Sequence, residues 1–270
     1  MNTLYQHLAG ESLSDALVRL ENEIKARPAD ADLRAAFVQF LTLSGNWTRA
    51  LTQLKSWLAL KPQAKPTVTL LEQCIQAELQ RAQVMAGERR PAMPEAQWPW
   101  LTTLAAALSE SDERAHALRL EALEQAQASA GQWTLENDET QTFEWLMDGD
   151  ARLGPVCETL VNGHYFWLPF SAIAEIRFQA PASVTDLVWR HALVRLTDGT
   201  EQVCQIPARY PFAADASDAV KLARTTEWLP LDDDGTLYEG LGQKAWLSEQ
   251  SESPLLSLSL VTFATDGAHE

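Results

Sequence analysis

The feature that most constrains the fold is an internal repeat in the first half of the chain. When the sequence is compared with itself at a shift of 34 residues, the apolar positions of residues 13–28 fall on those of residues 47–62. A repeat of this period arises when a helix–turn–helix unit is followed by a copy that packs against it. The aligned pairs are Leu13 with Trp47, Ala16 with Ala50, Leu17 with Leu51, Leu20 with Leu54, Ile24 with Leu58, and Pro28 with Pro62.

One unit is complete and runs from residue 28 to residue 62. Its two predicted helices each have an apolar face, Gly45 permits a tight turn between them, and Pro62 stops the second helix. A 34-residue unit of this kind is typical of the tetratricopeptide repeat. The first face consists of Leu33, Phe37, Phe40 and Leu41, and the second of Trp47, Ala50, Leu51, Leu54 and Leu58.

The repeat pattern weakens after residue 62. Leu71 and Ile75 still fit it, but Arg81 stands where the repeat predicts an apolar residue such as Trp47. We therefore predict one complete repeat, half a repeat before it and degenerate units after it. The later helices are predicted at about 67–87, 97–109 and 112–130, the last capped by Ser111 or Asp112.

Stacked helical repeats commonly hold a peptide or a helix against their concave face. An apolar residue on such a stack can therefore contact a partner, but it more often packs in the core between helices. Five residues are the candidates for partner binding, and core packing is the expectation for most of them. They are Leu33, Phe37, Phe40, Leu71 and Ile75.

From Trp133 onward, short runs of β-branched and aromatic residues replace the helical pattern. Residues 156–161 and 164–170 flank Asn162 and Gly163, which can both adopt the positive φ of a type I′ hairpin turn. The sequence therefore predicts an α+β protein, with a tetratricopeptide-like helical domain at 1–131 and a small, mostly antiparallel β domain at 132–270. Further strands are predicted at 173–178, 187–196, 201–206 and 255–263, with an Asp198-Gly199 turn and a short helix near 216–222.

The charge of the chain is concentrated in its second half. Residues 136–270 contain 8 Lys and Arg against 22 Asp and Glu, a net charge of -14 out of -16 for the whole chain. A surface this acidic repels nucleic acids and anionic lipids, so neither is an expected partner. No apolar run is long enough to span a membrane, and the N-terminus has no secretory signal pattern, so we expect a cytoplasmic protein.

The segment at 145–170, WLMDGDARLGPVCETLVNGHYFWLPF, contains the groups that most resemble an active site. Cys157 and His164 could form a nucleophile–base pair, but the predicted hairpin register pairs residue 157 with residue 168 and residue 161 with residue 164. The two groups are therefore expected to lie apart. A hydrolase or a ligand-binding enzyme that uses the β domain stays open as an alternative, and it requires a polar pocket containing Asp148, Asp150, Arg152 and His164.

The loop before the hairpin has a simpler interpretation. We predict that Arg152 pairs with a carboxylate and fixes the loop that contains Asp148, Asp150 and Gly154. No segment has the pattern of a phosphate-binding loop, a dinucleotide-binding loop or a metal site. We therefore predict no catalytic, cofactor-binding or metal-binding residues.

Six segments of the second half together resemble the ImpE family, also called TagJ. Their order and spacing match that family over nearly the whole second half, and the helical first half fits the family's helical domain. Lys244 departs from the pattern, because arginine is expected after the GxGQ sequence. The segments are DGDARLGPVCETLVNGHYFWLPF (148–170), AP (180–181), DLVWRHA (186–192), IPARYP (206–211), RTTEW (224–228) and GLGQKAWL (240–247).

The resemblance implies a function without catalysis. Members of this family are accessory proteins of the bacterial type VI secretion system. They are expected to bind the small subunit of the contractile sheath through the N-terminal helix of that subunit. They are also linked to the ClpV-type AAA+ ATPase that disassembles the contracted sheath. A helical-repeat scaffold unrelated to secretion is the remaining alternative.

Overall fold

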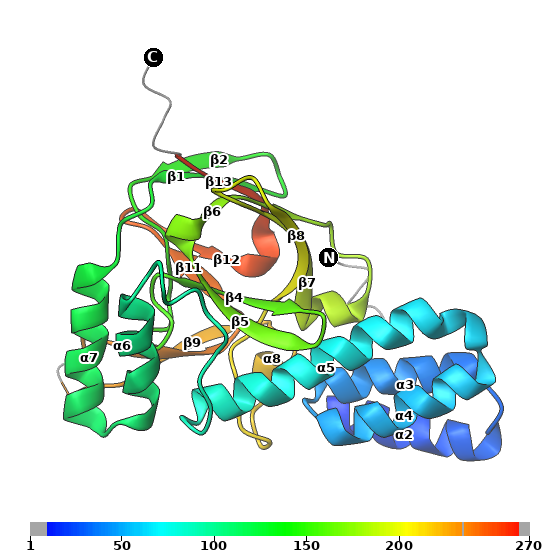
Figure 1. The fold of residues 1–270 in the computed structure, drawn as a ribbon. Helices are drawn as coiled ribbons and strands as arrows, with labels where there is room; N and C mark the ends of the chain where they lie inside the picture. The colour runs from blue at the N-terminus through cyan, green and yellow to red at the C-terminus, as the bar shows by residue number, and fades with distance from the viewer. Residues whose placement is uncertain (1–9, 234, 265–270) are drawn as a thin grey trace.

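Helices occupy the first half of the chain and antiparallel strands most of the second half (Figure 1). The computed structural model describes residues 10–233 and 235–264. The predicted α+β class is confirmed. The helices of the first half are α2 (Leu13–Ala26), α3 (Ala31–Leu43), α4 (Trp47–Leu60), α5 (Lys65–Met85), α6 (Trp100–Ala106) and α7 (Asp112–Gln125).

Helices α2 to α5 pack against one another in sequence order, each on the next. The predicted helix–turn–helix unit is confirmed as α3 and α4, which are joined through Gly45 with a φ of 73°. The carboxylate of Asp30 accepts hydrogen bonds from the first backbone N–H groups of α3, so the helix begins there. The assignment of this unit to the tetratricopeptide class stays a prediction.

Helix α5 connects the helical stack to the β strands. It extends from the stack past strands β4 and β5, which form the hairpin at 156–169 (Figure 1). The side chain of Gln80 donates a hydrogen bond to the carbonyl of Gly163 in the hairpin turn, at 2.8 Å. Pro66 lies in the first turn of α5, where its missing N–H is not needed, so the helix begins at residue 65 instead of residue 67.

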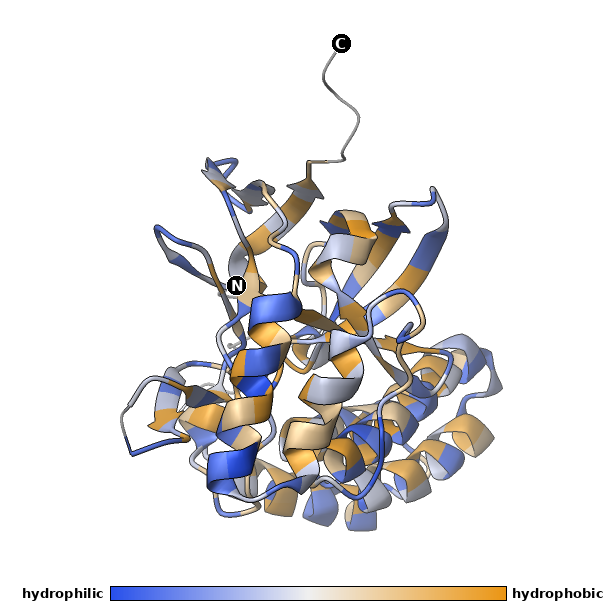
Figure 2. Ribbon diagram, turned by 60° about the vertical axis from the view of Figure 1, so that its left-hand side comes forward, coloured by the Kyte–Doolittle hydropathy of each residue, from blue (hydrophilic) through white to orange (hydrophobic). Residues whose placement is uncertain are grey.

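Helices α6 and α7 form a separate hairpin beside the strands. Hydrophobic and hydrophilic residues alternate along α7, whereas α6 has no strongly hydrophilic residue (Figure 2). Both are shorter than predicted. Helix α6 begins only after Pro99, and a 3-10 turn at Ala107–Ser109 follows it. Ser111, one of the two predicted capping residues, occupies the N-cap position of α7, but its side chain makes no capping hydrogen bond within the described residues. The helix ends where Ala126 adopts an extended conformation on the way to the first strand.

The main sheet has the strand order β2-β1-β13-β6-β7-β8-β4-β5 within the described residues, and its neighbouring strands are antiparallel. The predicted hairpin register is confirmed, because Val161 pairs with His164 and Cys157 with Leu168. Asn162 and Gly163 have φ values of 49° and 84°. The strands are β1 (Gly131–Leu135), β2 (Thr140–Phe143), β4 (Val156–Val161), β5 (His164–Pro169), β6 (Ile173–Phe178), β7 (Trp189–Leu196), β8 (Glu201–Pro207) and β13 (Leu258–Phe263).

Two of these strands begin later than predicted, because short 3-10 turns take their first residues. The turn at Val184–Leu187 is held by reciprocal hydrogen bonds between Ser183 and Asp186, so β7 begins at Trp189. The turn at Leu255–Ser257 likewise delays β13. The predicted short helix is α8 (Asp218–Lys221).

Two small sheets were not predicted from the sequence. Their strands have only two to five residues each, too few for a periodic pattern. One sheet pairs β9 with β10, and the other has the order β12-β11-β3. Their strands are β3 (Met147–Asp148), β9 (Thr226–Pro230), β10 (Tyr238–Gly242), β11 (Ala245–Leu247) and β12 (Glu252–Pro254).

A single hydrophobic cluster contains buried residues from both halves of the chain. The ring of Trp47 in α4 lies 5.8 Å from the ring of Trp189 in β7, so the helical stack packs directly on the sheet. The predicted domain boundary at 131–132 falls at the beginning of β1 and stays a prediction. Among the described helices, none is long and apolar enough to cross a membrane.

Two glycines with similar backbone angles provide a test of local packing. Gly199 (φ 86°) faces open space, whereas a Cβ on Gly242 (φ 81°) would lie 2.0 Å from the carbonyl oxygen of Thr225. We expect Gly199→Ala to lower the free energy of unfolding by about 1 kcal/mol, the cost of a left-handed alanine. Gly242→Ala should lower it by at least twice as much in urea denaturation. Equal losses for the two variants would contradict this packing.

Candidate functional site

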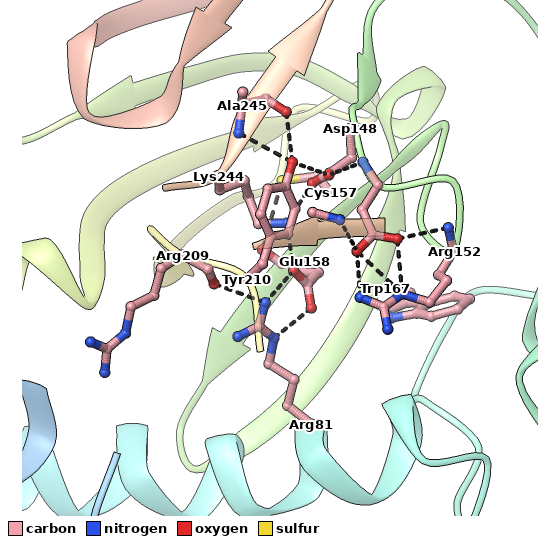
Figure 3. A network of polar contacts seen from close by, with 12 residues as sticks. Arg81, Asp148, Arg152, Cys157, Glu158, Trp167, Arg209, Tyr210, Lys244 and Ala245 are labelled. Carbon is pink, nitrogen blue, oxygen red and sulfur yellow. Dashed lines mark hydrogen bonds and ion pairs between the residues drawn. The ribbon is translucent and has the colours of Figure 1, made fainter. Parts of the chain in front are cut away.

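A buried carboxylate, that of Glu158, is the centre of a polar network between α5 and the β strands (Figure 3). Residues 156–160 of β4 are all buried, so this charge can be paired only within the protein. Its Oε1 accepts hydrogen bonds from Arg81 Nε at 2.7 Å and from the Tyr165 hydroxyl at 2.6 Å. Its Oε2 accepts from Arg81 Nη2 at 2.8 Å and is paired with Lys244 Nζ at 2.7 Å.

Lys244 extends this network to the loop that contains the predicted motif residues. Its Nζ donates to Asp148 Oδ2 at 2.5 Å and lies 4.5 Å from the centre of the Tyr210 ring. Asp148 Oδ1 accepts from the Tyr210 hydroxyl at 2.9 Å and from the backbone N–H of Asp150 at 3.0 Å. One ammonium group therefore joins two carboxylates, from β3 and β4, that are ten residues apart in the sequence.

At its other end the network includes Glu78 on α5. Glu78 Oε2 lies 3.4 Å from Arg81 Nη1, and its Oε1 accepts a hydrogen bond from the indole N–H of Trp189 at 2.9 Å. Arg81 also donates through Nη2 to the backbone carbonyl of Arg209 at 3.1 Å. The network therefore runs without a break from α5 through β4 to β3.

The Arg209 side chain fixes the end of α3. Its guanidinium donates to the carbonyls of Thr42 at 2.7 Å and Leu43 at 2.6 Å, and to the carbonyl of Lys221. These are carbonyls that a helix end leaves without partners inside the helix. Burial lowers the pKa of Arg209 to about 9. A buried cation thus caps the helical stack from the β side.

The charges of the network shift the pKa values of its members in opposite directions. Burial alone would raise the pKa of Glu158, but Arg81 and Lys244 outweigh it, so the pKa lies well below its usual range. Burial would likewise lower the pKa of Lys244, but Asp148 and Glu158 raise it. Burial raises the pKa of Asp148 to about 6, against the attraction of Lys244.

The loop of the predicted motif is held by a second ion-pair chain. Arg152 Nη2 lies 2.6 Å from Asp150 Oδ2, and its Nη1 lies 2.7 Å from Glu239 Oε2 on β10. Gly154 has a φ of 50° and donates its backbone N–H to the Asp150 carbonyl at 2.9 Å. Asp150 Oδ2 also accepts from the backbone N–H of Gly240 at 3.2 Å. Arg152 thus pairs with carboxylates, and these ion pairs fix the loop, as predicted from its sequence.

The proposed nucleophile and base lie apart. Cys157 is fully buried in β4, and burial raises the pKa of its thiol well above the usual range, which disfavours the reactive thiolate. His164 is exposed at the beginning of β5, with its ring 6.4 Å from the ring of Phe166. Over residues 10–233 and 235–264, no group of three or more His, Cys, Asp or Glu is arranged to hold a metal ion.

Four of the five candidate partner-binding residues belong to the core of the helical stack. Phe37, Phe40, Leu71 and Ile75 are buried, and Leu33 is partly buried against them. Most of them therefore stabilise contacts between helices, as expected. Leu33 is half-buried and Leu71 lines a cavity beside Trp189, so partner binding by these two residues stays a prediction.

Several network residues were not singled out from the sequence, although signals for two of them were present. Arg81 interrupts the repeat where an apolar residue is expected, and the structure shows that this position faces Glu158. Glu158 is the one charged residue of β4, whose other residues except Thr159 are apolar. Tyr165, Tyr210 and Glu78 had no comparable signal, because their partners lie at distant positions in the sequence.

Comparisons with known proteins agree with the resemblance found in the sequence. A family model described as ImpE protein matches residues 140–262, the part of the chain that contains Asp148, Glu158 and Lys244. The type VI secretion system accessory component TagJ of Pseudomonas aeruginosa is 36% identical over 256 residues, which cover 93% of this chain and 87% of TagJ. A Vibrio parahaemolyticus protein, solved by X-ray crystallography, has a TM-score of 0.84 and 28% identity. The match covers 100% of this chain and 98% of that one.

Removal of the Lys244 charge tests whether the fold depends on the network. Lys244→Met leaves two buried carboxylates without a shared cation, so we expect the free energy of unfolding to fall by about 3–5 kcal/mol. Lys244→Arg keeps the positive charge, so it should lower the free energy of unfolding less than Lys244→Met does. Lys55→Met, at an exposed position of α4, is the matched control and should change little. Equal stability of the two methionine variants in urea denaturation would show that the fold does not depend on this cation.

The raised pKa of Asp148 predicts a specific pH dependence of stability. Because this pKa is about 6 in the native state against an ordinary 3.8, the stabilising contribution of Asp148 is present below pH 3.8 and is lost as the pH rises through about 6. Relative to Asp148→Asn, the wild-type free energy of unfolding should therefore decrease over this range, as measured by urea denaturation at several pH values.

Glu158→Gln provides the opposite case. The pKa of Glu158 is lowered, so its contribution is present above its ordinary value of 4.5 and is lost as the pH falls. The difference in free energy of unfolding between the wild type and this variant should therefore grow as the pH rises to 4.5 and stay constant above it. For the Asp148 prediction, the contrary outcome is a free energy of unfolding that changes with pH in parallel for the wild type and Asp148→Asn. That outcome would contradict the raised pKa of Asp148.

Proposed function

The chain belongs to the ImpE family, and we propose that it serves as an accessory component of a type VI secretion system. The observation that carries this proposal is the 36% identity to TagJ over 93% of the chain. A match of that extent includes the helical half as well as the strands. A role that depends on both halves is therefore supported better than one that depends on the β strands alone.

Within this role, the chain acts as a non-enzymatic adaptor in the cytoplasm. It binds the small subunit of the contractile sheath through the N-terminal helix of that subunit, and it assists the ClpV-type ATPase in sheath disassembly. Two features support an adaptor. The ionisable groups of the motif loop pair with one another, and the Cys157 thiol lies fully buried away from His164. A rigid body built on buried ion pairs suits the presentation of a binding surface.

Calorimetry tests the proposed partner directly. Titration of the full-length protein with a peptide of the small sheath subunit's N-terminal helix should give saturable heat with micromolar affinity. A peptide of the same composition in scrambled order is the control, because it retains the charge but loses the apolar face. No heat with the native peptide, or equal heat with both, would overturn the adaptor proposal.

A variant separates this proposal from the enzyme alternative. Cys157→Ala removes the thiol that a hydrolase would need, and it should leave peptide affinity unchanged because Cys157 is inaccessible. Sheath turnover in cells that express this variant should equal that of the wild type. A loss of turnover with intact folding and intact peptide binding would favour a catalytic role instead.

A further inference from the structure

Two cavities lie between α7 and the chain that follows β9. One, of about 480 Å³, is lined by residues of the N-terminal half of α7, and the other, of about 240 Å³, by residues of its C-terminal half. Residues 230–233 line the first cavity and residues 236–238 line the second, so each cavity has α7 on one side and part of the chain between β9 and β10 on the other. We call the two cavities together the α7 groove.

The C-terminal half of the α7 groove is apolar. Helix α7 uses Ala115, Leu118 and Ala122 for buried packing, yet Leu120 and Leu123 on another face are each 40% exposed. Tyr238 of β10 lines the same cavity and is 38% exposed. Large apolar side chains exposed together around one concavity are typical of a protein-binding surface. The remaining apolar lining comes from Leu104, Met147, Leu237 and Leu247.

The N-terminal half of the α7 groove is acidic. Asp112, Glu113, Asp232 and Asp233 line it. Asp232 lies 3.3 Å from His116, whereas the other three carboxylates form no ion pair within the described part of the chain. They belong to a protein with a net charge of -16, so they add to an already negative field. This end of the groove therefore favours a positively charged occupant.

These observations favour one kind of occupant. An anionic ligand or a nucleic acid would be repelled by the carboxylates. A second copy of this chain would bring two acidic surfaces together, which is unfavourable for the same reason. A helix that carries leucine-like residues on one face and Lys or Arg residues at one end would satisfy both halves of the groove.

We propose that the α7 groove binds the partner segment of this adaptor, and that this segment is a basic amphipathic helix. The identity of the partner chain rests on the function proposed above, but the location and the chemistry do not. The partner then binds at the surface between α7 and β10, and not on the helical stack, where the predicted candidates are mostly buried.

Paired substitutions test this location. Leu120→Asp/Leu123→Asp should weaken binding of the sheath-subunit peptide by at least about tenfold in calorimetry, because it places charge in the apolar half. Leu60→Asp/Leu79→Asp is the matched control, since these leucines of α4 and α5 are 38% and 39% exposed on the helical stack. The control variant should bind like the wild type, and thermal melts should show that both variants are folded.

A charge reversal tests the acidic half independently. Asp233→Lys lies outside α7, so it does not alter that helix, and it should weaken binding and reduce its dependence on salt concentration. Unchanged affinity in both Asp233→Lys and the Leu120/Leu123 variant would overturn the proposal. A loss confined to the Leu60/Leu79 variant would also overturn it and would place the partner on the helical stack.

A second probe separates this inference from the proposed function. A designed amphipathic peptide of leucine and lysine should bind the wild type and the Leu60/Leu79 variant, and should bind the Leu120/Leu123 variant at least about tenfold more weakly. If the sheath-subunit peptide does not bind but the designed peptide shows this pattern, the proposed adaptor role is contradicted and the binding site in the α7 groove is supported. If the designed peptide binds all three proteins equally, the groove fails whatever the sheath peptide does.

Discussion

The arrangement of this protein depends on one buried carboxylate that is shared by two cations. Glu158 binds Arg81 of α5 on one side and Lys244 on the other, and Lys244 also binds Asp148. Buried ion pairs contribute little net stability compared with apolar residues, because desolvation opposes their attraction. However, the two charges of a buried pair have to stay in contact, because separating them leaves each charge buried without a partner. We infer that the network acts mainly by fixing the position of α5 against β4 and the motif loop.

The apolar core and the network act on the same interface. The packing of Trp47 on Trp189 supplies contact between the helical stack and the sheet, and Arg209 adds hydrogen bonds to the end of α3. Apolar contact alone permits small sliding of one element over another, whereas directed hydrogen bonds permit one register. The helices and the strands are therefore held as one body, on which an exposed groove can keep a constant shape.

Prediction from the sequence succeeded where the determinants are local. The turn at Asn162 and Gly163 defines its hairpin through its own backbone preferences, and the repeat defines α3 and α4 through the spacing of apolar residues. It failed for the short strands such as β3 and β11, which exist because distant segments pair with them. The polar network could not be predicted for the same reason. The partner of Arg81 is Glu158, which is 77 residues away in the sequence and lies beside it only in the folded protein.

The position of Lys244 has a consequence for how such a sequence can change over time. Four of the six segments that mark the family place a residue in or beside this cluster: Asp148 with Glu158, Trp189, Arg209 with Tyr210, and Lys244. A codon change in one segment that removes or reverses a charge would be harmful until a second change, far away in the gene, compensates for it. We therefore expect substitutions in these segments to be coupled, whereas an exposed residue such as Leu120 is under no such constraint from the buried charges.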